Sequence, residues 1–293
     1  MLRRMMMTGL MLWLLAACGS ADAADVFQLW AILSAPEVAS SGLSDLLTVE
    51  LSQRSFDLVE REQLAAITKE IELSTLLSPE GSSQRLNVGQ LTKADALVLL
   101  SLVEHDKKKF VKLVISDCQY GSRLRLDHFP VAADRADKLA AEIAQAATET
   151  RTKFARGVER IVAVSPFLSK NVTREFDHLQ FGFAALLGQS LAQHPGVAVL
   201  EIEEARSIGE ELTRSASKLE RRQVPLFVEG EFEITPSNDA SSEPGDWGSV
   251  HFALRILDGS AERETLTNRS KGRTDAVDWL TKSLSSRLLR RDG

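Results

Sequence analysis

The sequence predicts an α/β (α+β) protein made of two tandem domains, each with a mixed sheet and packed helices. Apolar residues alternate between helical and strand spacing along the chain, which is typical of sheets covered by helices. The order and spacing of these segments return about 140 residues later. The chain has 293 residues, enough for two apolar cores, and its 44% apolar and 26% charged residues are those of a globular protein.

The internal repeat can be followed position by position. Gly42 and Gly182 are 140 residues apart, and each precedes four apolar residues at the spacing of one helix face. These stripes are Leu43, Leu46, Leu47 and Leu51 in the first copy and Phe183, Leu186, Leu187 and Leu191 in the second. Further segments align as 56–60 with 197–201, 97–103 with 226–232, and 111–117 with 252–258. The shared order favours a tandem duplication over coincidence between two ordinary α/β segments.

The N-terminus has the form of an export signal. Arg3 and Arg4 form a basic region, an apolar stretch follows, and residues 15–18 read Leu-Ala-Ala-Cys. The apolar stretch is far shorter than the ~20 residues of a membrane-spanning helix. Residues 15–18 resemble a bacterial lipobox, so we expect a signal peptide over residues 1–17 and lipid attachment at Cys18. Ordinary cleavage after Ala23 is the alternative, and it stays open.

Charge and cysteine content narrow the classes of partner. Without residues 1–17 the chain has 33 basic and 41 acidic residues, a formal charge of −8, which disfavours a nucleic-acid partner. Cys118 is the only cysteine besides Cys18. If Cys18 is acylated or removed, no intramolecular disulfide can form, so each domain must rely on its apolar core.

The first domain is expected over residues 25–156. It starts with a largely apolar strand suited to the interior of a sheet. Apolar and polar residues alternate over 110–116, which indicates a hairpin strand with one solvent-exposed face. Composition predicts a loop at 78–83 and a chain reversal at 105–109. The expected elements are strand 26–33, helix 42–53, strand 56–60, helix 61–74, helix 86–92, strands 96–103, 110–116 and 124–129, and helix 133–154.

The second domain is expected over residues 158–291, after a junction at Gly157. No long flexible linker separates the domains, so we expect them to pack together. Its acidic pairs, Glu203–Glu204 and Glu210–Glu211, are predicted to be solvated helix surface. The expected elements are strand 161–164, helix 176–193, strand 197–202, helix 203–219, strands 226–234 and 250–257, and helix 275–289.

One motif in the first domain carries a family resemblance. A strand ends in Val-x-Arg-x-x-Leu, a glutamate follows, and Ala-Asp precedes the next buried strand. The residues at these positions are Val59, Arg61, Leu64, Glu70, Ala94 and Asp95. This pattern resembles the curli assembly/transport component (CsgG) family. The resemblance implies an anticodon-binding-like fold, shared with the N-terminal domain of TolB and with periplasmic lipoprotein regulators of peptidoglycan synthases.

The motif residues favour a structural role over a binding role. Arg61, at a strand-to-helix corner, can satisfy carbonyl groups or pair with Glu70, and Asp95 can cap free N–H groups before a buried strand. In the second domain Ile202 takes the place of Arg61, and Val224–Pro225 that of the Asp-Ala pair. The second copy is therefore degenerate and resembles the family only in shape.

The resemblance leaves two functions open. The family's channel-forming members add amphipathic hairpins, and a membrane-crossing strand needs about 9–11 residues. The segment 235–249 is polar and the reversal at 105–109 has five residues, so no such hairpin is expected. We expect a periplasmic adaptor or assembly factor, anchored to the outer membrane through Cys18, that binds an unidentified envelope protein. The alternative is a homo-oligomeric, curli-type secretion component of the outer membrane.

Motifs for catalysis are missing from the sequence. The five histidines are scattered without metal-ligand spacing, and no phosphate-binding, dinucleotide-binding or nucleophile-elbow motif is present. We therefore predict no catalytic residue, no metal, no cofactor and no enzymatic activity, and an inert thiol at Cys118.

Overall fold

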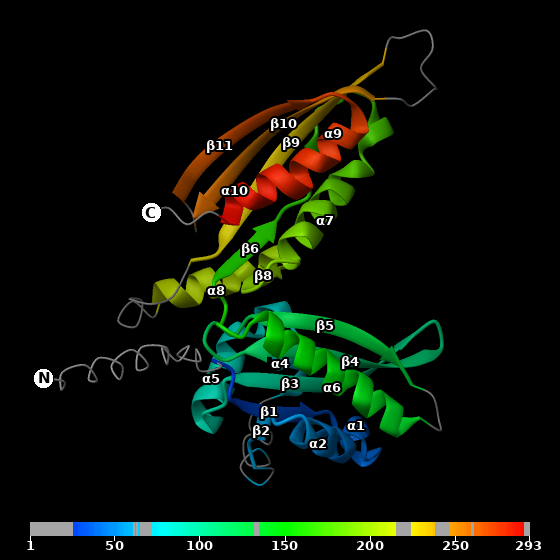
Figure 1. The fold of residues 1–293 in the computed structure, drawn as a ribbon, viewed down its shortest axis with the longest axis vertical. Helices are drawn as coiled ribbons and strands as arrows, with labels where there is room; N and C mark the ends of the chain where they lie inside the picture. The colour runs from blue at the N-terminus through cyan, green and yellow to red at the C-terminus, as the bar shows by residue number, and fades with distance from the viewer. Residues whose placement is uncertain are drawn as a thin grey trace, which may run out of the picture.

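The computed structural model describes residues 26–60, 62, 64, 72–131, 135–214, 224–237, 247–258 and 261–289. They form two mixed sheets with packed helices, which confirms the predicted fold class (Figure 1). We call the sheet nearer the N-terminus, with its helices, unit one, and the other unit two. Three residues of the earlier predictions, Cys18, Arg61 and Glu70, lie outside the described residues.

The sheet of unit one has five strands in the order β2-β1-β3-β4-β5. The strands are β1 (Leu29–Ser34), β2 (Asp57–Leu58), β3 (Ala96–His105), β4 (Lys108–Asp117) and β5 (Arg123–Pro130). β1 is parallel to both of its neighbours, whereas β3, β4 and β5 form an antiparallel meander. β1 and the first half of β3 are central and largely buried, as their apolar sequences predict.

Helices cover both faces of this sheet. They are α1 (Pro36–Ser40), α2 (Leu43–Gln53), α4 (Leu73–Leu77), the short η1 (Pro79–Gly81), α5 (Ser82–Thr92) and α6 (Ala136–Lys153). Val98 of β3 packs in a core with α2 and α6, and Leu97 and Leu99 pack on the opposite face with α4 and α5. Unit one is therefore a three-layer α/β/α structure.

The sheet of unit two has the order β11-β10-β9-β6-β8, with the short β7 beside β9. Its strands are β6 (Arg160–Val164), β7 (Leu168–Ser169), β8 (Val197–Leu200), β9 (Leu226–Pro236), β10 (Trp247–Asp258) and β11 (Ala261–Ser270). β6 is parallel to β8 and β9, and β9, β10 and β11 are antiparallel. Read from the other edge, the order is β8-β6-β9-β10-β11, which matches β2-β1-β3-β4-β5 of unit one strand by strand and in strand direction. A tandem duplication predicts this agreement, although the duplication itself stays a prediction.

One face of the β9–β11 sheet carries the helices of unit two (Figure 1). These are η2 (Arg174–Phe176), α7 (Leu179–Ala192), α9 (Gly272–Asp278), the π-helical η4 (Trp279–Leu284) and α10 (Ser285–Leu289). Together with the sheet they enclose a second core, centred on Phe183, Phe232 and Phe252. The remaining helix, α8 (Ile202–Arg214), lies between the units, where it contacts β6 on one side and α5 and η1 on the other.

The strand register corrects one part of the sequence alignment. Val98 pairs with Ile115 in unit one, and Val228 pairs with Ile256 in unit two. The equivalent of Val98 is therefore Val228, one residue beyond the partner that the aligned segments give it. A one-residue shift would turn every side chain of the strand to the other face of the sheet. In the observed register Val98 packs in the core beneath α2, and Val228 packs in the core beneath α7.

Several expected boundaries differ from the structure. The predicted loop at 78–83 is wrong, because η1 and the start of α5 occupy it. The chain reversal between β3 and β4 needs only Asp106 and Lys107, whose φ values of 49° and 62° give the tight hairpin geometry that follows the twist of the strands. Strand β11 was not predicted, since only two of its ten residues are buried and its charged residues hide the alternation.

Candidate functional site

Three of the family-motif residues lie in the core of unit one. Val59, Leu64 and Ala94 are buried among the side chains that fill the space between the sheet and the α4–α5 layer. None of the three lines either of the two pockets at α7 and at α6. Their burial supports a structural role.

Asp95 joins the start of β3 to the start of β1. Its Oδ2 accepts hydrogen bonds from the main-chain N–H groups of Gln28 at 2.9 Å and Leu29 at 2.8 Å. Its own N–H donates to the carbonyl of Leu29, and its carbonyl accepts from the N–H of Cys118. The carboxylate satisfies donors that the sheet leaves without a partner, so these contacts also support a structural role.

The Cys118 side chain is largely enclosed. Burial, together with the nearby carboxylates of Asp117 and Asp95, raises the pKa of its thiol. The Cβ of Cys118 lies so near Gly89 of α5 that a side chain at Gly89 would collide with it. Because the thiolate is the reactive form, this environment disfavours reaction of the native thiol.

A buried ion cluster lies where the two units meet. Glu204 of α8 is 1% exposed, and its Oε1 accepts hydrogen bonds from Arg85 Nη2 and from the main-chain N–H of Arg123, both at 2.8 Å. Its Oε2 accepts from Arg123 Nε at 2.8 Å, and Arg123 also pairs with Glu201 at 3.2 Å. The remaining donors of Arg85 reach the carbonyls of Leu76, Ser78, Pro79 and Gly121.

The charges in this cluster compensate one another. Burial lowers the pKa of Arg85 to about 10, so the guanidinium remains charged at neutral pH. Burial also raises the pKa of Glu204, against the opposing effect of Arg85 and Arg123. We call Arg85, Arg123 and Glu204 the interface triad. All five N–H groups of Arg85 and both oxygens of Glu204 make hydrogen bonds within the protein, so the triad is a structural connection.

The prediction that Glu204 is solvated surface is wrong. Glu203 is exposed as expected, but Glu204 precedes the buried Ala205 and stands four residues before the buried Ile208. It therefore lies at the edge of the apolar face of α8, next to the side of the helix that contacts η1 and α5. Its position at helical spacing from Ile208 and Leu212 was the available signal. Polar contacts from Ser82 to Ser207 and from Ser83 to Glu211 extend the same interface.

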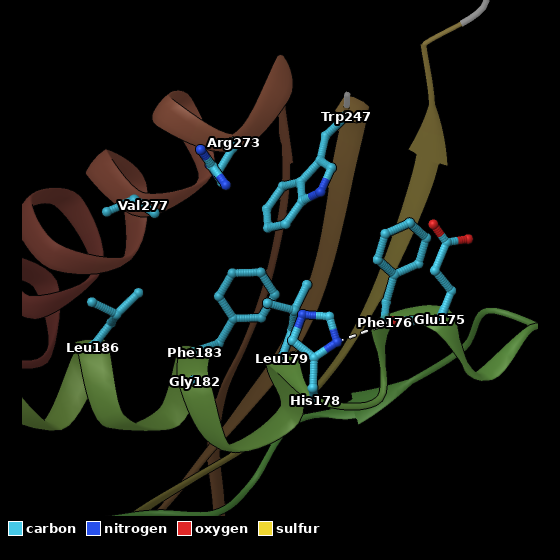
Figure 2. A pocket seen from close by; sticks show the side chains of 10 residues that line it. All are labelled: Glu175, Phe176, His178, Leu179, Gly182, Phe183, Leu186, Trp247, Arg273 and Val277. Atoms are coloured by element: carbon cyan, nitrogen blue, oxygen red, sulfur yellow. Dashed lines mark hydrogen bonds between the residues drawn. The ribbon is translucent and has the colours of Figure 1, made fainter. Parts of the chain in front are cut away.

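An apolar pocket in unit two is the candidate functional site. It has a volume of about 350 Å³ and lies between α7, the start of β10 and α9. Figure 2 shows Leu179, Phe183 and Leu186 extending from α7 toward Trp247 and Val277. Edge-to-face contacts fix the aromatic wall: Phe183 to Trp247 at 5.9 Å and Phe176 to Trp247 at 6.4 Å between ring centroids.

Polar groups stand at the rim of this pocket. Arg273 lies beside Trp247, with its guanidinium carbon 5.9 Å from the ring centroid. Glu175 approaches from η2 and His178 from the residue before α7, and Nδ1 of His178 lies 3.0 Å from the main-chain oxygen of Glu175 (Figure 2). The sequence analysis did not identify this site. Its walls are separated by up to about 100 residues, and no local motif joins them.

The comparison with protein families agrees with the motif. Residues 22–110 match the model of the curli production assembly/transport component CsgG. This confirms the predicted CsgG resemblance for the segment that carries the motif, whereas the relation to TolB stays a prediction. Among curated proteins, none matches the chain.

Solved structures with partial similarity include three bacterial proteins. A PelC dodecamer from Paraburkholderia phytofirmans has a TM-score of 0.27 and 17% identity, over 43% of this chain and 86% of that chain. Lipoprotein GNA1162 from Neisseria meningitidis has a TM-score of 0.28 and 10% identity, over 41% and 96%. The protein CT253 from Chlamydia trachomatis has a TM-score of 0.25 and 16% identity, over 43% and 84%. The fold assignment rests on the strand order rather than on these similarities.

Proposed function

We propose that this chain is an exported, non-enzymatic envelope protein of the CsgG-like class, a lipid-anchored adaptor that binds another envelope protein. The observation that carries the proposal is the position of the CsgG match. It begins at residue 22, four residues after Cys18, the last residue of the Leu-Ala-Ala-Cys motif. A lipidated cysteine at that place would tether unit one to a membrane surface.

The pocket of unit two supports binding rather than catalysis. Its lining contains no serine, threonine, cysteine or lysine that could act as a nucleophile. The only histidine in it, His178, contacts a main-chain oxygen, and no carboxylate among the described residues pairs with it. Apolar walls with a few polar groups at the rim are typical of recognition sites. Within the described residues, no helix is both long and apolar enough to cross a bilayer.

Metabolic labelling tests the lipid anchor. In a bacterial host fed an alkyne analogue of palmitate, we expect the wild-type protein to take up the label and to sediment with membranes. Cys18→Ala is expected to lose the label and to be released from the membrane fraction. Cys118→Ala removes the other cysteine and should be labelled like the wild type. Unlabelled wild-type protein with a mature N-terminus at Ala24 would instead establish ordinary signal cleavage.

The native mass distinguishes an adaptor from a secretion component. We expect the membrane-extracted protein in mild detergent to scatter light as a monomer or dimer of the processed chain, whose full sequence before cleavage has a mass of 32.2 kDa. An adaptor needs no closed ring, whereas the secretion component predicted as the alternative would assemble from many copies. A ring-sized mass for the wild-type protein would overturn the adaptor and favour that alternative.

A further inference from the structure

We propose that the pocket of unit two is a docking site for a peptide segment of the envelope partner, in which a large apolar side chain stands next to a carboxylate. The inference rests on the proposed function, because it names the surface through which the adaptor would act. It is carried by three features: the aromatic wall, the cation at the rim, and the exposed apolar residues of α7 and of the segment before it.

The aromatic wall is already formed in the free protein. Phe183 is buried and contacts Phe232 and Phe252 at centroid distances of 5.0 and 5.2 Å, and Trp247 lies against Phe183. Phe252 in turn stacks on Trp279. A side chain that enters the pocket would meet rings held in place from behind. It would therefore be bound without the cost of ordering the wall.

The cation at the rim defines the second element of the ligand. Arg273 is exposed and lies beside Trp247, and it has no carboxylate partner within the part of the chain that the structure describes. A carboxylate next to the inserted side chain would meet this guanidinium in a charge-assisted hydrogen bond. On the opposite side, Glu175 and His178 can accept or donate hydrogen bonds to a peptide backbone.

The surface beyond the pocket indicates a polypeptide rather than a small amphiphile. Helix α7 contains no charged residue, and its Phe181, one position before the pocket residue Gly182, is 69% exposed. Leu168 and Val172, in the segment that precedes α7, are exposed as well. The matching helix of unit one, α2, carries Asp45 and Glu50 instead. An uncharged surface helix with an exposed aromatic residue is typical of a contact surface, and a single acyl chain would leave it uncovered.

Selection from a displayed random-peptide library on the immobilised full chain tests the inference. We expect enriched sequences to share a large aromatic or aliphatic residue adjacent to Asp or Glu. Synthetic peptides with the enriched sequence should bind the wild-type protein, and the same peptides with Asn or Gln in place of the acid should bind about tenfold less tightly. Enrichment without any acidic position would contradict the assigned role of Arg273.

Two glycines provide a matched steric test. A Cβ at Gly182 or at Gly209 has no atom within 4 Å, and both residues lie in helices, α7 and α8 respectively. Gly182→Leu would fill the pocket without strain and should weaken binding of the selected peptides at least about tenfold. Gly209→Leu adds the same side chain elsewhere and should leave binding unchanged. Equal binding by both variants would place the peptide outside the pocket.

A charge reversal tests the rim. Arg273→Glu should bind the acidic peptides at least about tenfold more weakly and should select basic residues beside the apolar position. Lys271→Glu makes the same charge change at an exposed residue two positions away and should keep the preference for acids. Loss of the acidic preference in both variants would show a diffuse charge effect rather than a specific partner at Arg273.

Palmitate and peptide can be compared directly. The selected peptides should remain bound when sodium palmitate is added below its micellar concentration. If palmitate displaces the peptides from the wild-type protein, and if the Arg273→Glu variant binds palmitate as tightly as the wild type, the occupant is an acyl chain. That result would overturn the proposal of a peptide ligand. If the selection yields no peptide although the protein is lipidated at Cys18 and is a monomer or dimer, the proposed docking site is wrong. In that case the adaptor would bind its partner through another surface.

Discussion

Glu204→Gln is expected to lower the free energy of unfolding by about 3–5 kcal/mol, the range for breaking a buried ion pair by removing one partner. Among the residues that the structure describes, Glu204 is the only acid in a salt bridge with the buried Arg85, and it also accepts hydrogen bonds from the side chain and the main-chain N–H of Arg123. Glutamine is close to glutamate in shape but neutral. The substitution therefore leaves the buried guanidinium of Arg85 without its compensating charge and leaves Arg123 paired only with the exposed Glu201.

Urea unfolding followed by tryptophan fluorescence measures this effect, because Trp30 reports on unit one and Trp247 and Trp279 on unit two. Glu203→Gln is the matched control: it makes the same chemical change on the same helix at an exposed position, and its midpoint should stay at the wild-type value. Equal midpoints for the two variants would mean that the interface triad adds nothing to the junction of the units.

Phe183→Ala is expected to lower the free energy of unfolding by about 3–5 kcal/mol, the usual cost of truncating a buried Phe to Ala. Phe183 is buried at the centre of the unit-two core and touches Phe232, Phe252 and Trp247 edge to face. Truncation would leave a cavity between α7 and the sheet. It would also remove aromatic contacts that add to the loss of buried area.

Phe181→Ala is the matched control on the same helix, two residues away and mostly exposed. Its unfolding midpoint should stay near the wild-type value, whereas binding of the selected peptides should weaken because the exposed ring is part of the proposed contact surface. Thermal unfolding by circular dichroism, with peptide titrations on the folded variants, separates the two effects. A large loss of stability in Phe181→Ala would show that its ring packs within the protein and is not free for a partner.

The fold was largely predictable because its signals are local. The apolar stripe of α2 and the continuous apolar run at the start of β3 each report burial through the spacing of neighbouring residues. Where that signal is weak, the prediction was wrong. β11 alternates charges around the single buried apolar residue Leu266, and α5 begins with polar residues whose burial depends on α8.

The candidate sites were not predictable in the same way. Glu204 was taken for solvated surface, because a glutamate beside another glutamate on a helix is usually exposed, and its two arginines lie 119 and 81 residues away. The pocket joins α7, β10 and α9, so no short window of sequence contains its wall. The motif residues Val59, Leu64 and Ala94 could be identified from the sequence because they lie in one continuous segment.

The sequence alone determined the order of most elements, the apolar face of most of them and the CsgG resemblance of residues 22–110. These properties depend on the periodicity of neighbouring residues, which the chain carries before it folds. Only the tertiary structure decided that α8 inserts a charged residue between the units and that Arg273 stands beside Trp247. Such pairings depend on how helices and sheets cross in space, and the spacing of residues along one element does not encode that geometry.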